Sequence, residues 1–166
     1  MIEDEQFYRD ECVELSRFFA KHQKELGEIH ALGRRIIKFY QVLEPFFHEF
    51  TESVCHCCAV PCCVNRHGFP DFEDLVLFLA MGQGLPDYNF NVIDTDKCQF
   101  LGPNGCSLPR QARSYRCTWY FCDHVLDEFE HLNSKRFHRF DVELERLGRC
   151  RSVLLERFSE LWFLSH

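Results

Sequence analysis

Hydrophobic residues recur every three or four positions over the first third of the chain. This spacing places them on one side of an α-helix, and charged residues such as Glu14 and Lys21 fall on the other side. The stripe consists of Leu15, Phe19, His22, Leu26, Ile29, Gly33, Ile36, Tyr40, Leu43, Phe47, Phe50 and Val54. One unbroken helix of about 40 residues would be about 60 Å long, which exceeds a compact domain of this size. The pattern therefore predicts two helices, with a break at Gly27 or Gly33 and a kink or restart near Pro45.

A second apolar stripe runs through the last third of the chain. Its members are Phe129, Leu132, Phe137, Phe140, Leu144, Leu147, Leu154, Phe158 and Leu161. Charged residues fill the positions between them, which predicts amphipathic helices with a break at Asn133-Ser134. Asp123 is a candidate N-cap for the first of these helices, because its carboxylate can accept hydrogen bonds from free backbone N–H groups. We interpret the apolar residues of both stripes as core.

The segment between the two stripes is rich in cysteine, glycine and proline. A short helix is predicted there from Pro70 or Asp71 to Met81, because acidic residues suit its first turn and a Gly-Gln-Gly sequence follows its end. The sequence thus predicts a mainly α-helical single domain in three parts. These are a helical arm at 1–54, an irregular cysteine-rich metal-binding region at 55–122 and a second helical arm at 123–166.

The cysteine count adds chemistry to this picture. The chain has 11 cysteines in 166 residues, an odd number, and a chain of this length can bury a core without disulfides. The acidic N-terminal sequence lacks the basic start and apolar run of a signal peptide. We therefore expect a cytoplasmic protein whose thiols stay reduced or bind metal.

Charge and hydropathy argue against two classes of partner. The formal net charge is −7, and the only local group of basic residues in the middle segment is Arg110, Arg113 and Arg116. A surface that follows nucleic-acid phosphates needs clustered lysine and arginine, so no nucleic-acid partner is expected. The longest apolar run, Leu75–Met81, is far shorter than the roughly 20 residues of a membrane span, so no membrane partner is expected either.

Nine of the eleven cysteines lie in the middle segment. They are Cys55, Cys57, Cys58, Cys62, Cys63, Cys98, Cys106, Cys117 and Cys122. The other two, Cys12 and Cys150, occupy apolar-leaning helical positions and are interpreted as small buried hydrophobic residues. Thiolates bind zinc and iron–sulfur clusters, and short spacings between them let the chain curl around one ion.

The first cysteine run has such spacings. Two residues separate Cys55 from Cys58, and three separate Cys58 from Cys62. Cys62 and Cys63 are adjacent, and in extended backbone the side chains of neighbouring residues point to opposite sides. One segment can therefore serve two metal sites or bridge two ions.

The remaining cysteines fall in a second run. A Pro-Asn-Gly sequence between Cys98 and Cys106 predicts a turn that brings their sulfur atoms together. Cys117 and Cys122 enclose Thr-Trp-Tyr-Phe, an aromatic sequence expected to shield the site from water. Cys122 directly precedes the helix predicted at Asp123, whose dipole favours a thiolate. The three nearby arginines are expected to offset negative charge.

This arrangement, over about residues 52–124, resembles the YkgJ-type cysteine-cluster family, which is described as a CxxCxxCC zinc- or iron-chelating domain. The match covers the first four cysteines, a downstream aspartate at Asp71, the C-x-F-L…G-C element, and a closing stretch with Arg113. The resemblance implies metal chelation by Cys55, Cys58, Cys62, Cys63, Cys98, Cys106, Cys117 and Cys122. It implies no single reaction, since similar cysteine sets also occur in flagellin lysine-methylase-like proteins.

Other polar residues have alternative interpretations. His56, His67 and His124 flank the cysteines and would complete a Cys₃His site, or they are ordinary surface histidines. Asp71 orients a ligand, or it only caps the short helix. Arg113 neutralises the site or binds a partner carboxylate, or it is simply an exposed arginine.

Three functional classes remain. The first, which we favour, is a protein that chelates zinc or iron, the iron either mononuclear or in an iron–sulfur cluster. The second is an iron–sulfur-dependent redox or modifying enzyme, for which no nucleophile–base pair or Gly-rich cofactor loop assigns catalytic residues. The third is a metal-stabilised module whose helices bind a protein partner or self-associate. Zinc and iron both accept tetrahedral thiolate sites, so the sequence does not separate them.

Overall fold

A computed structural model describes residues 5–52, 54–55, 58, 61–103, 105–130 and 134–165. It is mainly α-helical, as the two apolar stripes predict, with one short two-stranded sheet. The helices are α1 (Glu5–Lys21), α2 (Gly27–Glu52), α3 (Asn65–Gly68), α4 (Phe72–Ala80), α5 (Arg116–Trp119), α6 (Asp123–Glu130) and α7 (Ser134–Leu164). The strands are β1 (Leu101–Gly102) and β2 (Gly105–Cys106), and η2 (Arg110–Ala112) is a short 3₁₀ helix.

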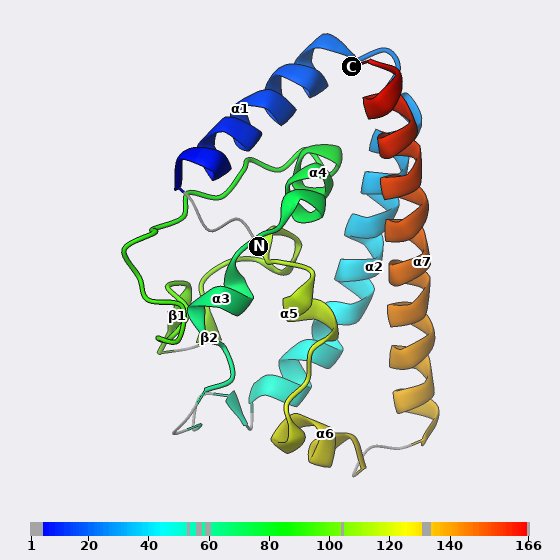
Figure 1. Cartoon of the computed structure of the whole chain (residues 1–166). Coiled ribbons are helices and arrows are strands. Elements are labelled where there is room, and N and C mark those ends of the chain that lie inside the picture. Colours follow the sequence, from blue (N-terminus) through cyan, green and yellow to red (C-terminus); the bar gives the residue numbers. More distant parts are fainter. Residues whose placement is uncertain are drawn as a thin grey trace.

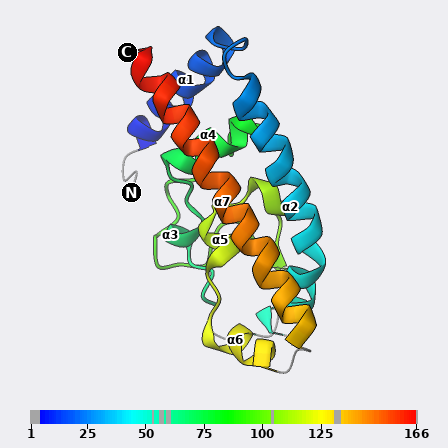
Figure 2. The same cartoon turned by 90° about the vertical axis from the view of Figure 1, so that its right-hand side faces the viewer.

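The two longest helices, α2 and α7, form the side of the molecule against which the rest packs. They run antiparallel and next to each other in both views (Figures 1 and 2), and they share more contacts than any other pair of elements. α1 crosses one end of this pair, and α4 lies between α1 and the pair. The cysteine-rich middle segment lies beside the pair, and α6 lies at the opposite end from α1 (Figure 1).

Both apolar stripes face a common core, which confirms their interpretation. The buried members are Leu15, Phe19, Leu26, Ile29, Ile36, Tyr40, Leu43, Phe47, Phe140, Leu147, Leu154 and Phe158. Burying a side chain of this size contributes about 1.5–3 kcal/mol, so packing between the arms is a major source of stability. Phe137 is an exception, because 38% of its surface remains exposed. Leu132 and the side chain of Phe50 lie outside the described residues.

The first stripe forms two helices, as predicted. The break is a turn over residues 22–26, just before Gly27, which begins α2, and not at Gly33. Gly33 lies within α2, where a Cβ atom would collide with the backbone carbonyl of Ala80, so this glycine lets α4 approach α2 closely. A kink or restart was predicted near Pro45; the restart does not occur, because α2 continues through this residue to Glu52. Phe46 and Phe47, just after the proline, are buried, and this packing offsets the lost backbone hydrogen bond.

The short helix α4 is confirmed, together with its caps. Asp71 is the N-cap: its carboxylate accepts a hydrogen bond from Asp74 N at 2.9 Å, and Asp71 N donates to Asp74 Oδ2 at 3.3 Å. Gly82 follows the helix with φ of +71°, a conformation that glycine adopts without strain. Asp74 is buried and also accepts a hydrogen bond from Tyr115 N at 2.9 Å, which joins α4 to α5.

The helices of the last third begin close to their predicted positions. Asp123 is the first residue of α6 rather than its N-cap, and Cys122 precedes the helix with its carbonyl accepting from Val125 N at 2.9 Å. α7 begins at Ser134, at the predicted break, and Asn133 lies outside the described residues. Within the described part of the chain, no helix combines the length and apolar character needed to cross a membrane.

Candidate metal centre

Seven of the eight cysteines proposed as ligands line one cavity of about 140 Å³. They are Cys55, Cys62, Cys63, Cys98, Cys106, Cys117 and Cys122. They come from the chain just beyond α2, the segment before α3, the residues before β1, strand β2, α5 and the residue before α6. The fold thus brings thiols from several distant segments to one place.

The eighth residue, Cys58, does not line this cavity, although it is half-buried and near the first cysteine of the set. Burial raises the pKa of Cys55, and the charges of Cys122 and Cys58 raise that pKa further. Cys57 and His56 lie outside the described residues.

The segment that carries Cys62 and Cys63 is fixed by a buried asparagine. Asn65 is 1% exposed, and its Nδ2 donates a hydrogen bond to Val92 O at 3.0 Å. Its Oδ1 accepts from Gln99 Nε2 at 3.1 Å, and Tyr88 Oη donates to its backbone carbonyl at 2.8 Å. A single asparagine has no periodicity around it, so the sequence pattern gave no indication of its role.

The next cysteine is held against the same segment. Cys98 N donates a hydrogen bond to Cys63 O at 2.9 Å. A Cβ atom on Gly68 would lie 2.5 Å from Cys98 Sγ, so only glycine leaves room for the sulfur in this position. Cys117 Sγ lies 3.9 Å from His67 O, which links α5 to α3.

The predicted turn between Cys98 and Cys106 is confirmed by a β-hairpin. β1 and β2 pair antiparallel with Leu101 opposite Cys106, and Leu101 N donates to Cys98 O at 2.8 Å. Asn104 at the tip lies outside the described residues. Both thiols line the cavity, as the spacing indicated.

Four thiols that interact electrostatically are called the hairpin group: Cys63, Cys98, Cys106 and Cys117. Cys63 also interacts with Cys55, which lies outside this group. Burial raises the pKa of Cys117 to about 11, and the charges of Cys106 and Cys98 raise it as well. Desolvation of the thiol raises the pKa of Cys63, although the residue as a whole is exposed, and the charge of Cys117 is the next largest cause. Each thiolate thus opposes ionisation of its neighbours.

The other four thiols form a second set, which we call the arm group: Cys55, Cys58, Cys62 and Cys122. Burial is the largest cause that raises the pKa of Cys62, and the charges of Cys63 and Cys122 raise this pKa further. The charge of Cys63 acts on Cys62, and the charge of Cys55 acts on Cys63, so the two groups adjoin. That the neighbouring side chains of Cys62 and Cys63 serve different metal sites stays a prediction.

Positive charge also faces the cavity, since Arg110, Arg113 and Arg116 all line it. Arg110 is buried; its Cζ lies 3.9 Å from the Phe47 ring centroid, and its Nη1 donates to Cys117 O at 3.0 Å. Its Nε lies 3.5 Å from Glu44 Oε2, an ion pair without hydrogen-bond geometry. The charges of Arg113 and Arg110 lower the pKa of Cys117 and so oppose the effects of burial.

The aromatic sequence before Cys122 only partly shields the cavity. Tyr120 and Phe121 line it, and the Phe121 ring stacks on the Phe47 ring at 6.2 Å between centroids. Trp119 does not line it and is 51% exposed. The expectation that all three rings exclude water from the thiols is therefore wrong for Trp119, because the short α5 helix ends there.

The thiols do not form a closed coordination shell as they stand. Among the described residues, no three cysteine, histidine, aspartate or glutamate side chains are gathered closely enough to hold one ion. All ten described cysteines are free thiols. Segments that carry cysteines therefore meet around one cavity, but their sulfur atoms are not arranged to coordinate a metal ion.

The other residues considered as ligands differ in position. His67 lines the cavity, with Nδ1 3.1 Å from Cys62 O, whereas His124 is exposed on α6 and does not line it. Asp71 caps α4 and lines a different cavity, which favours the capping interpretation. Cys150 is buried in α7, as expected, and Cys12 is half-buried.

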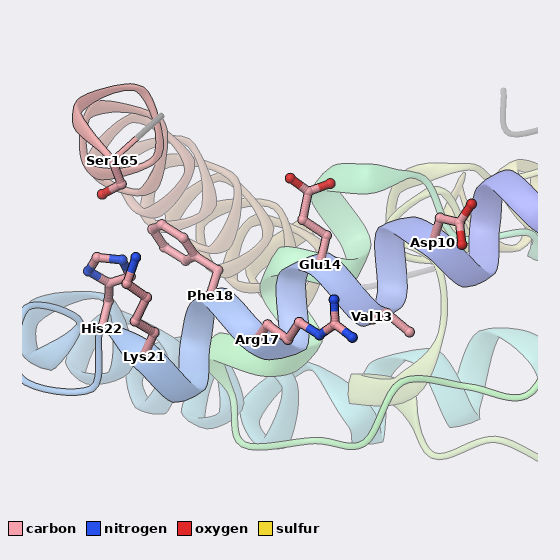
Figure 3. Close-up of a pocket in the computed structure, with 8 residues that line it drawn as sticks. All are labelled: Asp10, Val13, Glu14, Arg17, Phe18, Lys21, His22 and Ser165. Atoms are coloured by element: carbon pink, nitrogen blue, oxygen red, sulfur yellow. The ribbon is translucent and has the colours of Figure 1, made fainter.

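A second, more open cavity of about 460 Å³ lies between α1 and the end of α7 (Figure 3). Figure 3 shows that its polar side chains come mainly from α1 and carry both signs of charge, as in Asp10 and Arg17. The Phe18 ring packs against His22 at 4.5 Å between centroids, so this histidine serves helix packing. The cysteine cavity is the stronger candidate for chemistry.

Comparison with known proteins adds no assignment: no family model, no curated protein and no solved structure matches the chain. A functional assignment therefore depends on the geometry of the cysteine cavity.

Proposed function

We propose that this protein binds zinc or iron, the iron either as single ions or in an iron–sulfur cluster, through the hairpin group and the arm group. The observation that carries this proposal is the lining of one cavity by seven of the eight cysteines. On the same residues we propose membership of the YkgJ-type cysteine-cluster family.

The donor set fits such a metal. Zinc and iron–sulfur centres are bound by four thiolates each, and two adjoining groups of four would supply two such centres. A purely structural role explains the set less well, because thiols that serve only as core residues have no reason to converge from so many segments. The buried cation of Arg110 beside Cys117 would offset part of the charge of bound thiolates.

Binding requires adjustment, because the described thiols are not yet gathered around one point. A cysteine side chain has one rotatable bond before its sulfur, so rotation of several side chains costs little. Binding also requires loss of the thiol protons, which makes affinity increase with pH. A bound metal would supply a cross-link between segments that are otherwise joined by backbone hydrogen bonds.

Elemental analysis of protein purified without oxygen tests this function. We expect at least one equivalent of zinc or iron per chain, and a lower content in Cys117→Ser. Cys12→Ser is the matched control, because Cys12 lies on α1 outside the cavity, and its metal content should equal that of the unmodified protein. Protein that carries no metal while its thiols are fully reduced would contradict the proposal.

The absorption spectrum of the same sample separates the alternatives. Charge-transfer bands in the visible region would favour an iron–sulfur centre and the enzyme class. A colourless protein with zinc would favour a structural metal and the interaction-module class, and light scattering that shows a strict monomer would weaken self-association.

A further inference from the structure

A third cavity, of about 460 Å³, is bordered by Trp119 and three arginines. We propose that it binds a small molecule in which a flat aromatic ring is joined to an oxyanion, with a nucleoside monophosphate as the simplest example. Its volume falls in the range of roughly 300–1,000 Å³ that is typical of small-molecule sites. The cavity contains none of the eight cysteines, so this proposal does not rest on metal binding.

The charges of the lining favour an anion. Arg66 on α3 and Arg116 on α5 are exposed, and neither forms an ion pair with any residue that the structure describes. The single carboxylate of the lining, Asp71, already accepts a hydrogen bond from Asp74 N at 2.9 Å. Guanidinium groups without a carboxylate partner are available for strong, charge-assisted hydrogen bonds to phosphate or carboxylate oxygens.

The third arginine, Arg151, is held in place on α7. Its Nη2 lies 2.5 Å from Glu73 Oε2, and its Cζ lies 4.3 Å from the centroid of the Tyr115 ring. Its Nε is buried and makes no hydrogen bond within the described residues. Because this guanidinium is already ordered, a ligand that contacts it loses less conformational entropy.

The aromatic part of the proposed ligand follows from Trp119. This side chain is 51% exposed at the end of α5 and lines the cavity beside Arg116. A flat ring stacked on the indole would remove apolar surface of both partners from water, and stacking of bases on tryptophan tolerates many ring types. An inorganic anion would leave this surface exposed.

The cavity borders the candidate metal centre. Arg116 lines both cavities, and the next residue, Cys117, belongs to the hairpin group. A ligand whose oxyanion contacts Arg116 therefore lies next to the cysteine cavity. This position makes α5 the element shared by the two sites.

Titration with AMP tests the site, with the intact protein followed by tryptophan fluorescence and by calorimetry. We expect saturable binding of AMP, and at least tenfold weaker binding of both adenosine and inorganic phosphate. Arg66→Ala and Arg116→Ala should each weaken AMP binding about tenfold, through loss of a charged hydrogen bond. Trp119→Ala should weaken binding in calorimetry and abolish the fluorescence change.

Arg149→Ala is the matched control. Arg149 is an exposed arginine of α7 that pairs with Glu145 at 3.3 Å and does not line the cavity, so its loss should leave AMP binding unchanged. Absence of any response to millimolar AMP would overturn the proposal. So would equal losses in Arg66→Ala and Arg149→Ala, or binding of adenosine or phosphate alone as tight as that of AMP.

Discussion

The helical arms and the cysteine-rich middle segment are held together by different forces. The arms bury large apolar residues such as Leu147 and Phe158 between long helices. Within the middle segment, α4 joins this apolar core, whereas the cysteine-bearing parts contain short elements joined by hydrogen bonds, several of them at Asn65. The arms thus have their own source of stability, whereas the geometry of the thiols depends on a network that a bound metal would reinforce.

The largest expected effect is on the arms. Leu147 is fully buried in α7, so Leu147→Ala should lower the free energy of unfolding by about 2–5 kcal/mol. Metal content per folded chain should not change, since Leu147 does not line the cysteine cavity. Urea unfolding and elemental analysis measure the two quantities. Val153→Ala, at a position 41% exposed on the same helix, is the control.

An intermediate effect is expected inside the middle segment, at Asp74, where α4 meets α5. Burial raises the pKa of Asp74 to about 6, because its carboxylate is enclosed between α4 and α5. The folded-state pKa lies above the unfolded value of about 4, so the protonated form favours folding. This contribution is complete below pH 4 and is lost as the pH rises through 6.

Replacement of Asp74 by asparagine should remove this dependence. We expect the free energies of unfolding of Asp74→Asn and the unmodified protein to diverge by about 1–3 kcal/mol between pH 4 and pH 6, the unmodified protein losing more. Thiol protonation affects both proteins equally and cancels in the difference. Parallel pH profiles would show that Asp74 is not perturbed by burial.

The smallest effect on the free energy of unfolding is expected for a substitution that clearly lowers metal affinity. In Gly68→Ala the new Cβ would displace Cys98 Sγ, which is the movable end of a side chain, so unfolding should change little. Metal affinity should fall about tenfold, as it does when groups that position a ligand are altered. Competition with a chelator measures this change. Gly84→Ala is the control, because no atom of the described residues other than its chain neighbours lies within 4 Å of the place that its new Cβ would occupy.

The sequence predicted the helices of the arms well, because many apolar residues at three- and four-residue spacing each indicate the same buried helix face. The helix from Phe72 to Ala80 and the hairpin after Cys98 were also predictable, because capping and turn residues act on their immediate neighbours. The uninterrupted helix at Pro45 was not predictable, since its stability depends on tertiary packing that local propensity ignores.

The site was predictable in its residue types but not in its arrangement. Spacing indicated most of the cysteines that line one cavity, but it did not reveal that Cys58 lies off this cavity or that Asn65 fixes the segment beside it. The sequence also predicted that Trp119 shields the thiols from water, whereas its position at the end of α5 makes it line another cavity. Each of these features depends on contacts between residues far apart in the chain, which no local pattern contains.

The most direct test of the central claim is X-ray absorption at the metal edge of protein purified without oxygen. The account predicts coordination by about four sulfur atoms per metal, at about 2.3 Å if the metal is zinc. It also predicts that serine substitution of one hairpin-group cysteine lowers the sulfur count or the metal content. Coordination by nitrogen and oxygen atoms alone would contradict the claim that these thiols converge on a metal.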